Sequence, residues 1–281
     1  MFNGIVTILI GYLLLFLLFA SCIIILLDRV SLAGVLYSKQ RERPWYIQIF
    51  YEVLPVLIVI MVVRTYLVEP FSIPSESMYP QLTQGDYVLV NKTSSALKFP
   101  FTNTSIIQLH ELNRGDVFVF QNPLDTNMFF IKRMIAKGGD TVKFSGDDLY
   151  INNQIVPRTL AKGDDIPIEP GYRFSYEQLG EHRYLIRRTM QIDSEKFSQN
   201  SPFLQMRADR INNPNLIIDA NKTGSEDLTI TIPKGYYFFM GDNRDHSLDS
   251  RAWGLVQEDL IVGRTSFVYH HFLKRISHWN G

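Results

Sequence analysis

Two serines stand one residue apart in a short segment bounded by prolines. Pro74 and Pro80 flank Ser75 and Ser77 in the run IPSESMYP, residues 73–80. Because proline fixes its own φ and restricts the residue before it, this segment is expected to be extended and stiff. A serine hydroxyl held in such a segment could act as a nucleophile. Clusters of serine and proline also occur in ordinary loops, so the segment alone leaves both interpretations open.

A lysine lies in a run that is otherwise apolar enough to be a core strand. Lys132 stands between Phe130 and Met134 in MFFIKRMI, residues 128–135, and strand alternation places these three side chains on one face. Burial among apolar neighbours disfavours the charged ammonium and lowers the pKa of the lysine. The neutral amine could then act as a general base. The alternative is a lysine that extends to solvent at a strand edge.

A loop dense in polar groups follows the apolar run at residues 236–240. Its sequence is GDNRDHSLDSRAWG, residues 241–254. Such a loop could be a solvated turn. It could equally be a braced site in which Asp249 pairs with Arg244 or Arg251, because guanidinium–carboxylate pairs fix loops well.

A histidine base is the alternative to the lysine. His246 lies in the same loop, so a Ser77–His246–Asp249 triad is conceivable. The sequence contains no Gly-x-Ser-x-Gly elbow, and an α/β-hydrolase is therefore not supported.

Two apolar stretches precede these residues. Residues 5–27 carry no charge and are long enough to cross a bilayer core of about 30 Å. A cleaved signal peptide is the competing interpretation, but no basic segment precedes the run. Residues 47–68 contain Glu52 and Arg64, and the alternative there is an interfacial or core helix. We predict that residues 1–70 are a membrane anchor with two spans.

The charges between these stretches predict the orientation of the chain. The connector, residues 28–46, carries four Lys and Arg residues, whereas the segment before the first span carries none. The positive-inside rule therefore places the connector in the cytoplasm. Residues 71–281 would then lie outside the cytoplasm, and Ser77 would follow the second span by only a few residues.

Short β-type runs broken by Gly, Asn, Asp and Pro follow residue 80. The sequence predicts a mainly β fold, an antiparallel sheet domain at 71–281 with the more polar residues 145–230 as an inserted cap subdomain. The cap is expected to contain a hairpin of 184–186 and 190–192. The other expected strands are 87–90, 117–120, 128–135, 141–144, 149–151, 228–232, 236–240 and 267–269.

Bulk composition excludes several classes of protein. Lys plus Arg equals Asp plus Glu, 28 each, so there is no electrostatic footprint for nucleic acid. The single cysteine, Cys22, rules out an intrachain disulfide. We see no metal-binding cluster or phosphate loop and expect no cofactor. No feature indicates an oligomeric state.

In order and spacing, five motifs resemble those of the bacterial type I signal peptidases, or leader peptidases, of the two-span form. That family consists of membrane-bound serine proteases that remove signal peptides from exported proteins after small residues. The motifs are residues 74–82, 85–92, 114–120, 130–133 and 241–254. The chain departs from the family pattern at Ala136 and Gly138, where a Gly and a Pro are usual, which affects a turn more than a catalytic group.

The resemblance implies a role for each matching residue. Ser77 would be the nucleophile and Lys132 the general base of a Ser-Lys dyad. The Ser75 hydroxyl and the Ser77 backbone N–H would form the oxyanion hole, and Ser247 would orient the lysine. The residues expected to brace the loop are Asp249, Arg251, Asp242 and Arg244. Those expected to line shallow apolar pockets for small substrate residues are Ile73, Pro74, Met78, Leu82 and Phe130.

The same resemblance implies partners and a location. The partners would be signal-peptide-bearing preproteins and the lipid bilayer, and no nucleic acid. The location would be the bacterial inner (cytoplasmic) membrane, with the catalytic domain on the periplasmic side. The alternative function is that of a membrane-tethered β domain that binds exported chains without cleaving them.

Overall fold

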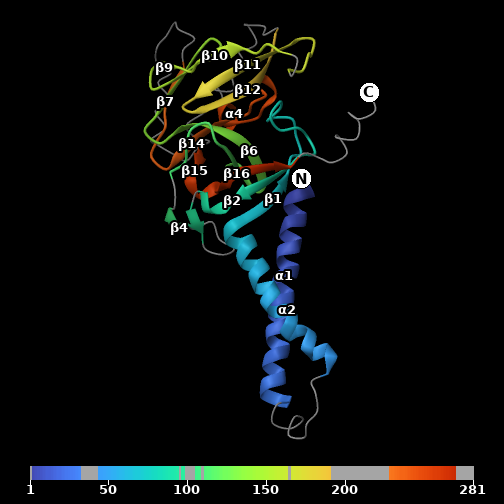
Figure 1. Cartoon of the computed structure of the whole chain (residues 1–281). Helices are drawn as coiled ribbons and strands as arrows, with labels where there is room; N and C mark the ends of the chain where they lie inside the picture. The colour runs from blue at the N-terminus through green and yellow to red at the C-terminus, as the bar shows by residue number, and fades with distance from the viewer. Residues whose placement is uncertain are drawn as a thin grey trace, which may run out of the picture. The chain divides into compact units, whose positions relative to one another are not determined.

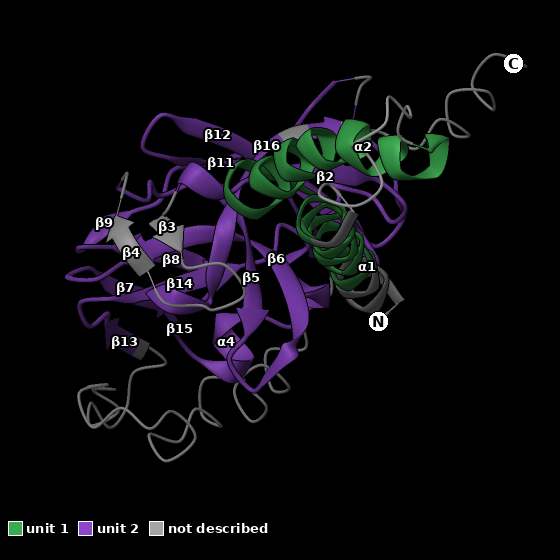
Figure 2. Cartoon of the chain, turned by 90° about the horizontal axis from the view of Figure 1, so that it is seen from below, with its two compact units in different colours: residues 1–69 green, residues 70–281 purple. Residues whose placement is uncertain are grey.

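The computed structural model in Figure 1 describes residues 2–32, 44–94, 96–98, 105–108, 111–163, 166–190 and 228–269 of the 281-residue chain. The chain divides into two compact units, residues 1–69 and 70–281, which Figure 2 colours separately. The first unit is mainly helical and the second is built mainly from strands.

The first unit consists of two long apolar helices, each followed by a short π-helical extension. Their bounds are Phe2–Leu27 (α1), Asp28–Leu32 (η1), Trp45–Val62 (α2) and Val63–Leu67 (η2). The segments Ile10–Val30 and Trp45–Leu67 are long and apolar enough to cross a membrane, with mean hydropathies of 2.9 and 2.2. Both predicted apolar stretches are therefore helices of spanning length. Residues 33–43 of the predicted connector lie outside the described residues.

The described strands form four sheets. The largest has the order β1-β2-β16-β5-β6-β14-β15, and its paired strands are antiparallel wherever a register is defined. Their bounds are Val68–Ser72 (β1), Tyr87–Asn91 (β2), Val117–Asn122 (β5), Asp125–Lys137 (β6), Tyr236–Met240 (β14), Val256–Gln257 (β15) and Ile261–Tyr269 (β16).

Three smaller antiparallel sheets complete the second unit. The first has the order β13-β7-β8-β9, the second β10-β11-β12, and the third is the pair β3-β4. Their bounds are Leu228–Thr231 (β13), Thr141–Ser145 (β7), Asp148–Ile151 (β8), Gln154–Ile155 (β9), Arg158–Leu160 (β10), Tyr172–Leu179 (β11), His182–Thr189 (β12), Ala96–Lys98 (β3) and Ser105–Gln108 (β4). The prediction of a mainly antiparallel β fold after two apolar helices is confirmed.

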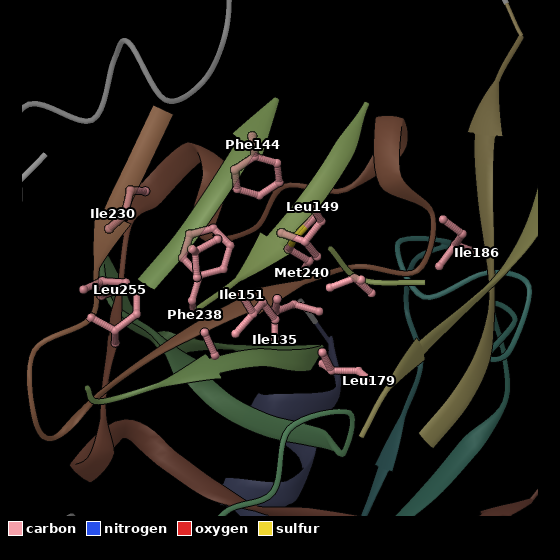
Figure 3. Close-up of a cluster of buried hydrophobic side chains, with 14 of the residues drawn as sticks. Ile135, Phe144, Leu149, Ile151, Leu179, Ile186, Ile230, Phe238, Met240 and Leu255 are labelled. Atoms are coloured by element: carbon pink, nitrogen blue, oxygen red, sulfur yellow. The ribbon is translucent and has the colours of Figure 1, made fainter. Parts of the chain in front are cut away.

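One buried cluster joins the largest sheet to two of the smaller ones. Figure 3 shows Phe144 of β7, Ile230 of β13 and Phe238 of β14 within it, although they come from distant parts of the sequence. Leu179 of β11 and Ile186 of β12 belong to the same cluster. Described residues of the predicted 145–230 cap thus share a core with β14. The cap's boundaries stay a prediction, because residues 191–227 lie outside the described residues.

The predicted hairpin of 184–186 and 190–192 is wrong for its first strand, and residues 191 and 192 lie outside the described residues. Residues 184–186 lie inside β12, whose antiparallel partner is β11, with Tyr184 opposite Glu177. The chain reverses at Gly180, which adopts φ +62°, a conformation that glycine tolerates without a Cβ penalty. Residues 172–179 mix polar and apolar side chains, so no apolar run marked them in the sequence and this strand was not predicted.

The two departures from the family pattern have simple packing environments. Ala136 is fully buried opposite Phe238 of β14. A Cβ on Gly138 would come within 2.8 Å of Lys234 Cα and 2.9 Å of the Pro233 carbonyl oxygen. The turn after β6 is therefore packed against the chain just before β14 so closely that only glycine fits as the backbone stands.

Candidate active site

Ser77 and Lys132 meet beside β6 of the largest sheet. Lys132 lies on β6 opposite Phe118 of β5, and Ser77 lies in the segment between β1 and β2. The Ser77 Oγ and Lys132 Nζ atoms are 2.6 Å apart, and Nζ also donates to the Ile131 carbonyl at 2.9 Å. The lysine is 3% exposed and the serine 9%. A serine hydroxyl and a lysine amine are thus in direct contact, largely shielded from water.

Burial determines the protonation of the lysine. Desolvation of the ammonium lowers the pKa of Lys132 to about 8, and nearby Arg251 acts in the same direction. The carboxylates of Asp249 and Asp242 oppose this shift and raise the pKa. The Phe130 ring lies 5.4 Å from Nζ and forms part of the apolar surroundings that the sequence predicted. A substantial fraction of this amine is neutral near physiological pH.

The second serine of the segment stands beside the first. Ser75 is exposed, and its Oγ lies 3.3 Å from the Ser77 Oγ. The backbone of the segment is tied to the 241–254 loop, because Asn243 N donates to the Ser77 carbonyl and Asn243 Nδ2 donates to the Glu76 carbonyl, both at 3.1 Å. Sequence reasoning missed Asn243, which had no signal beyond its place in a polar loop.

The 241–254 loop is a braced site and not a solvated turn. Asp249 is fully buried and accepts from Arg251 Nε at 2.8 Å, from Arg251 Nη2 at 2.9 Å and from Gly241 N at 2.9 Å. It also caps the short helix α4, Ser250–Trp253. Burial by itself raises the pKa of the Asp249 carboxyl, but Arg251 and the other donors hold it below its ordinary value. The carboxylate is therefore charged and fixes the loop.

Asp242 pairs with the arginine that follows Lys132. Arg133 Nε and Nη2 donate to Asp242 Oδ1 and Oδ2 at 2.8 and 2.6 Å, a bidentate arrangement. The same guanidinium donates to the Gly115 carbonyl and to the Gln81 side chain, and Arg133 Cζ lies 3.9 Å from the centroid of the Tyr184 ring. This pair fixes β6 to the loop directly beside the Lys132 position.

Arg244 pairs with Glu177 and not with Asp249, which settles the alternative that the sequence left open. Arg244 Nη1 and Nη2 donate to Glu177 Oε1 and Oε2 at 2.7 and 2.5 Å, and both side chains are almost completely buried. Burial alone would raise the pKa of Glu177, but Arg244 holds it below its ordinary value. Because Glu177 lies on β11, the loop is anchored to the 172–189 hairpin.

Ser247 lies against the segment that carries Ser77. An added Cβ on Gly241 would stand 2.2 Å from the Ser247 Oγ and 2.4 Å from the Ser77 carbonyl oxygen, so all three groups crowd one place. The Ser247 Oγ is buried, and within the described structure no partner meets hydrogen-bond distance and angle limits. It is still near enough to Asp249 to help lower the pKa of that carboxyl. The predicted orientation of Lys132 by this hydroxyl stays a prediction.

The predicted pocket residues lie at two depths. Ile73, Met78 and Leu82 are 2%, 0% and 4% exposed and pack in one cluster beneath the segment. Pro74 is exposed, and Phe130 is partly buried, with its ring stacked on Trp253 at 5.9 Å between centroids. Their role as a substrate pocket stays a prediction.

His246 is exposed, and its ring contacts Tyr172, with Nε2 3.4 Å from the phenol oxygen. Across the described residues no hydrogen bond joins it to Ser77 or Asp249, so the geometry does not assemble the triad. In the same part of the chain no group of three or more His, Cys, Asp or Glu side chains could hold a metal ion.

A family model and two similar proteins indicate the same family. The family model described as "Signal peptidase, peptidase S26" matches residues 46–270. Signal peptidase I of Buchnera aphidicola subsp. Acyrthosiphon pisum (strain APS) is 32% identical over 254 residues, which cover 86% of this chain and 81% of the relative. Signal peptidase I of Pseudomonas aeruginosa (strain PAO1) is 34% identical over 243 residues, which cover 83% and 75%.

A crystal structure of a signal peptidase I from Enterococcus faecalis V583 is also similar, at 23% identity and a TM-score of 0.28, over 56% of this chain and 97% of that chain. The family model spans most of the sequence, and both relatives align over most of their own length. The chain therefore belongs to the signal peptidase family, peptidase S26.

Proposed function

We propose that Ser77 and Lys132 are the catalytic dyad with which this signal peptidase removes signal peptides from preproteins. The observation that carries the proposal is the 2.6 Å contact between the serine oxygen and a buried lysine whose pKa is lowered to about 8. A buried neutral amine in contact with a hydroxyl is the arrangement that general-base activation of a nucleophile requires.

The proposed acylation step begins with proton transfer from the Ser77 hydroxyl to the Lys132 amine. The Ser77 oxygen attacks the scissile carbonyl carbon, a C–O bond forms, and the π electrons move to the carbonyl oxygen. The Ser75 hydroxyl and the Ser77 backbone N–H donate to that oxyanion. When the intermediate collapses, the C–N bond breaks and the Lys132 ammonium protonates the leaving amine.

Deacylation repeats these transfers with water. The neutral Lys132 amine accepts a proton from a water molecule, whose oxygen attacks the Ser77 ester carbonyl. Collapse breaks the bond to the Ser77 oxygen, which takes the proton back from Lys132. The products are a signal peptide with a new carboxylate and a mature protein with a new amine.

The two apolar helices support a proposed place at the membrane. Their length and hydropathy suit a bilayer, and the basic connector favours a cytoplasmic loop between them. The catalytic unit would then lie on the outer face of the bacterial inner membrane. A substrate held in the bilayer by an apolar helix would present its cleavage site close to that surface. The small residue before the cut would enter the apolar surroundings of Pro74 and Phe130.

Cleavage of a purified preprotein tests this function. The wild-type protein in detergent is expected to cut the substrate after a small residue, as mass spectrometry of both products would show. His246→Ala is expected to keep a near-wild-type rate, because its exposed ring contacts Tyr172 and not the dyad. No cleavage by the wild type would favour the non-catalytic binding domain, and loss of cleavage in His246→Ala would favour the triad.

The rate should depend on pH through the amine of Lys132. With a pKa of about 8, the neutral and active fraction falls about tenfold for each pH unit below that value. We therefore expect kcat/KM to rise with pH and to level off above about pH 8 to 9. The profile is to be measured for the wild type and for His246→Ala, and the two are expected to coincide. A midpoint near the ordinary histidine value of about 6.5 would contradict the lysine base.

A further inference from the structure

We propose that Asn243 is a positioning residue that aims the Ser77 backbone N–H at the developing oxyanion, and that Arg187 of β12 holds Asn243 in the required orientation. This inference rests on the proposed function of the dyad. It assigns part of the predicted cap a role in the chemistry of the Ser77 segment.

The first step concerns the peptide unit between Glu76 and Ser77. Its carbonyl oxygen accepts from Asn243 Nδ2 at 3.1 Å. This peptide is trans, so its C=O and N–H bonds point in opposite directions. Fixing the carbonyl on Asn243 therefore turns the Ser77 N–H away from the 241–254 loop. No acceptor for that N–H is found in the part of the chain that the structure describes, which leaves it available to a substrate oxygen.

The second step concerns the next carbonyl along the chain. The Asn243 backbone N–H donates to the Ser77 carbonyl oxygen at 3.1 Å. One residue therefore holds both carbonyls that flank the Ser77 nitrogen and α-carbon. Two such bonds restrict rotation of the peptide and keep its N–H preorganised, which is the property that makes an oxyanion donor effective.

The third step is the control of the Asn243 amide itself. A carboxamide has one accepting and one donating end, and either end could face Glu76. Arg187 Nε donates to Asn243 Oδ1 at 3.2 Å, and a guanidinium can only donate. The oxygen must therefore face Arg187, and the NH₂ group must face the Glu76 carbonyl. The Arg187 backbone N–H also donates to the Asp242 carbonyl at 2.9 Å.

Arg187 is itself tightly held. Its Nη1 donates to Glu169 at 2.6 Å, and Cζ lies 4.6 and 4.3 Å from the ring centroids of Tyr79 and Tyr172. Its side chain is only 10% exposed. Contact with two rings and an ion pair to Glu169 restrain the guanidinium plane, which a lysine ammonium would not reproduce. The contact of Arg187 with Asn243 is thus a fixed feature and not a passing surface contact.

The test compares Asn243→Asp, Asn243→Ala, Arg187→Ala and Arg187→Lys with Arg183→Ala as the matched control. Arg183 lies on the same strand but is exposed, with Cζ 4.1 Å from the Tyr176 ring centroid. We expect each Asn243 and Arg187 variant to lower kcat by about tenfold to a hundredfold while KM changes little. Arg183→Ala is expected to behave as the wild type. Asn243→Asp keeps the shape and the arginine partner, but it replaces the donor to Glu76 with a buried negative charge. Asn243→Ala removes the same donor without adding a charge, so a similar fall in kcat in both variants assigns the effect to the lost hydrogen bond.

The inhibition constant of a peptide aldehyde is a second measurement, and it should stay unchanged if Asn243 and Arg187 have only a structural role. Addition of the Ser77 hydroxyl to the aldehyde forms a tetrahedral hemiacetal whose oxygen occupies the oxyanion position. We expect its inhibition constant to rise in proportion to the fall in kcat. We also expect Arg187→Ala to add little to Asn243→Ala, because both changes act on one amide.

Two results would overturn the inference. One is wild-type kcat in Asn243→Asp and Arg187→Ala. The other is a fall in kcat with unchanged aldehyde affinity, which would make the contacts purely structural. Ser77→Ala is measured in the same series: if it still cleaves, the dyad itself is wrong, whereas an inactive Ser77→Ala with normal Asn243 and Arg187 variants rejects only this inference.

Discussion

Ser77→Ala and Lys132→Ala are each expected to lower kcat/KM by about 10⁴-fold or more, and the double variant is expected to lose no more than either single variant. The reason is that, in the proposed mechanism, the two groups act as one unit. Without the Ser77 oxygen there is no nucleophile, and without the Lys132 amine the hydroxyl keeps its proton. Rates of preprotein cleavage, measured for all three variants at one pH above 8, give the comparison.

Lys132→Arg separates the base from the charge. A guanidinium stays protonated in proteins and cannot accept the serine proton, so this variant should be as inactive as Lys132→Ala. The matched control is Lys137→Ala. Lys137 lies on the same strand, but its ammonium pairs with the exposed Glu111 at 3.1 Å. We expect this control to cleave at the wild-type rate. Substantial activity in Lys132→Ala at any pH would refute the dyad.

The pair of Ser77 and Lys132 can be predicted from the sequence because the residues next to each of them in the chain already mark it. A lysine in the apolar run 128–135 stands out against its neighbours, and strand alternation already groups it with Phe130. The two prolines around Ser77 likewise mark a stiff segment without any knowledge of the fold. Short β-type runs bounded by turn residues also predict strands at 87–90, 117–120 and 128–135, which the structure confirms as β2, β5 and β6.

The pairing of buried charges cannot be predicted from the sequence, since the partners lie far apart along the chain. Arg244 has acidic neighbours in its own loop, but its partner is Glu177, 67 positions away on β11. Glu177 lies in the more polar region 145–230, to which the sequence assigned no part in the site. Only the register of the 172–189 hairpin turns it inward, where leaving Arg244 unpaired would be costly. Asn243 escaped notice for the same reason, because its partners Glu76 and Arg187 come from two other segments.

Gly241→Ala is expected to lower kcat/KM by about a hundredfold or more, although the change adds a single methyl group. Gly241 joins the end of β14 to Asp242. Its added Cβ would stand 2.4 Å from the Ser77 carbonyl oxygen and 2.2 Å from the Ser247 Oγ. Both separations are far below van der Waals contact, so the 241–254 loop and the Ser77 segment would have to move apart.

Gly138→Ala is the matched control. Its Cβ would also meet backbone, at 2.8 Å from Lys234 Cα, but in a turn made by the chain after β6 and the chain before β14. This variant should lower the melting temperature while the folded protein keeps its specific activity. Thermal unfolding and kcat/KM are measured for both alanine variants. Together they separate a steric clash that only lowers the stability of the fold from one that displaces Ser77.

The double variant Gly241→Ala/Ser247→Gly decides which neighbour matters. A serine side chain can rotate or be removed, but the Ser77 carbonyl oxygen belongs to the backbone that carries the nucleophile. If that carbonyl is the obstacle, the double variant stays inactive. Recovery of activity would instead show that the Ser247 side chain alone requires glycine here. Ser247→Gly alone is the control, because Ser247 is itself predicted to orient Lys132. If that single variant keeps activity and the double variant does not, the close approach of two backbones at Gly241 sets the position of Ser77 relative to Lys132, where misplacement of about 1 Å is already costly.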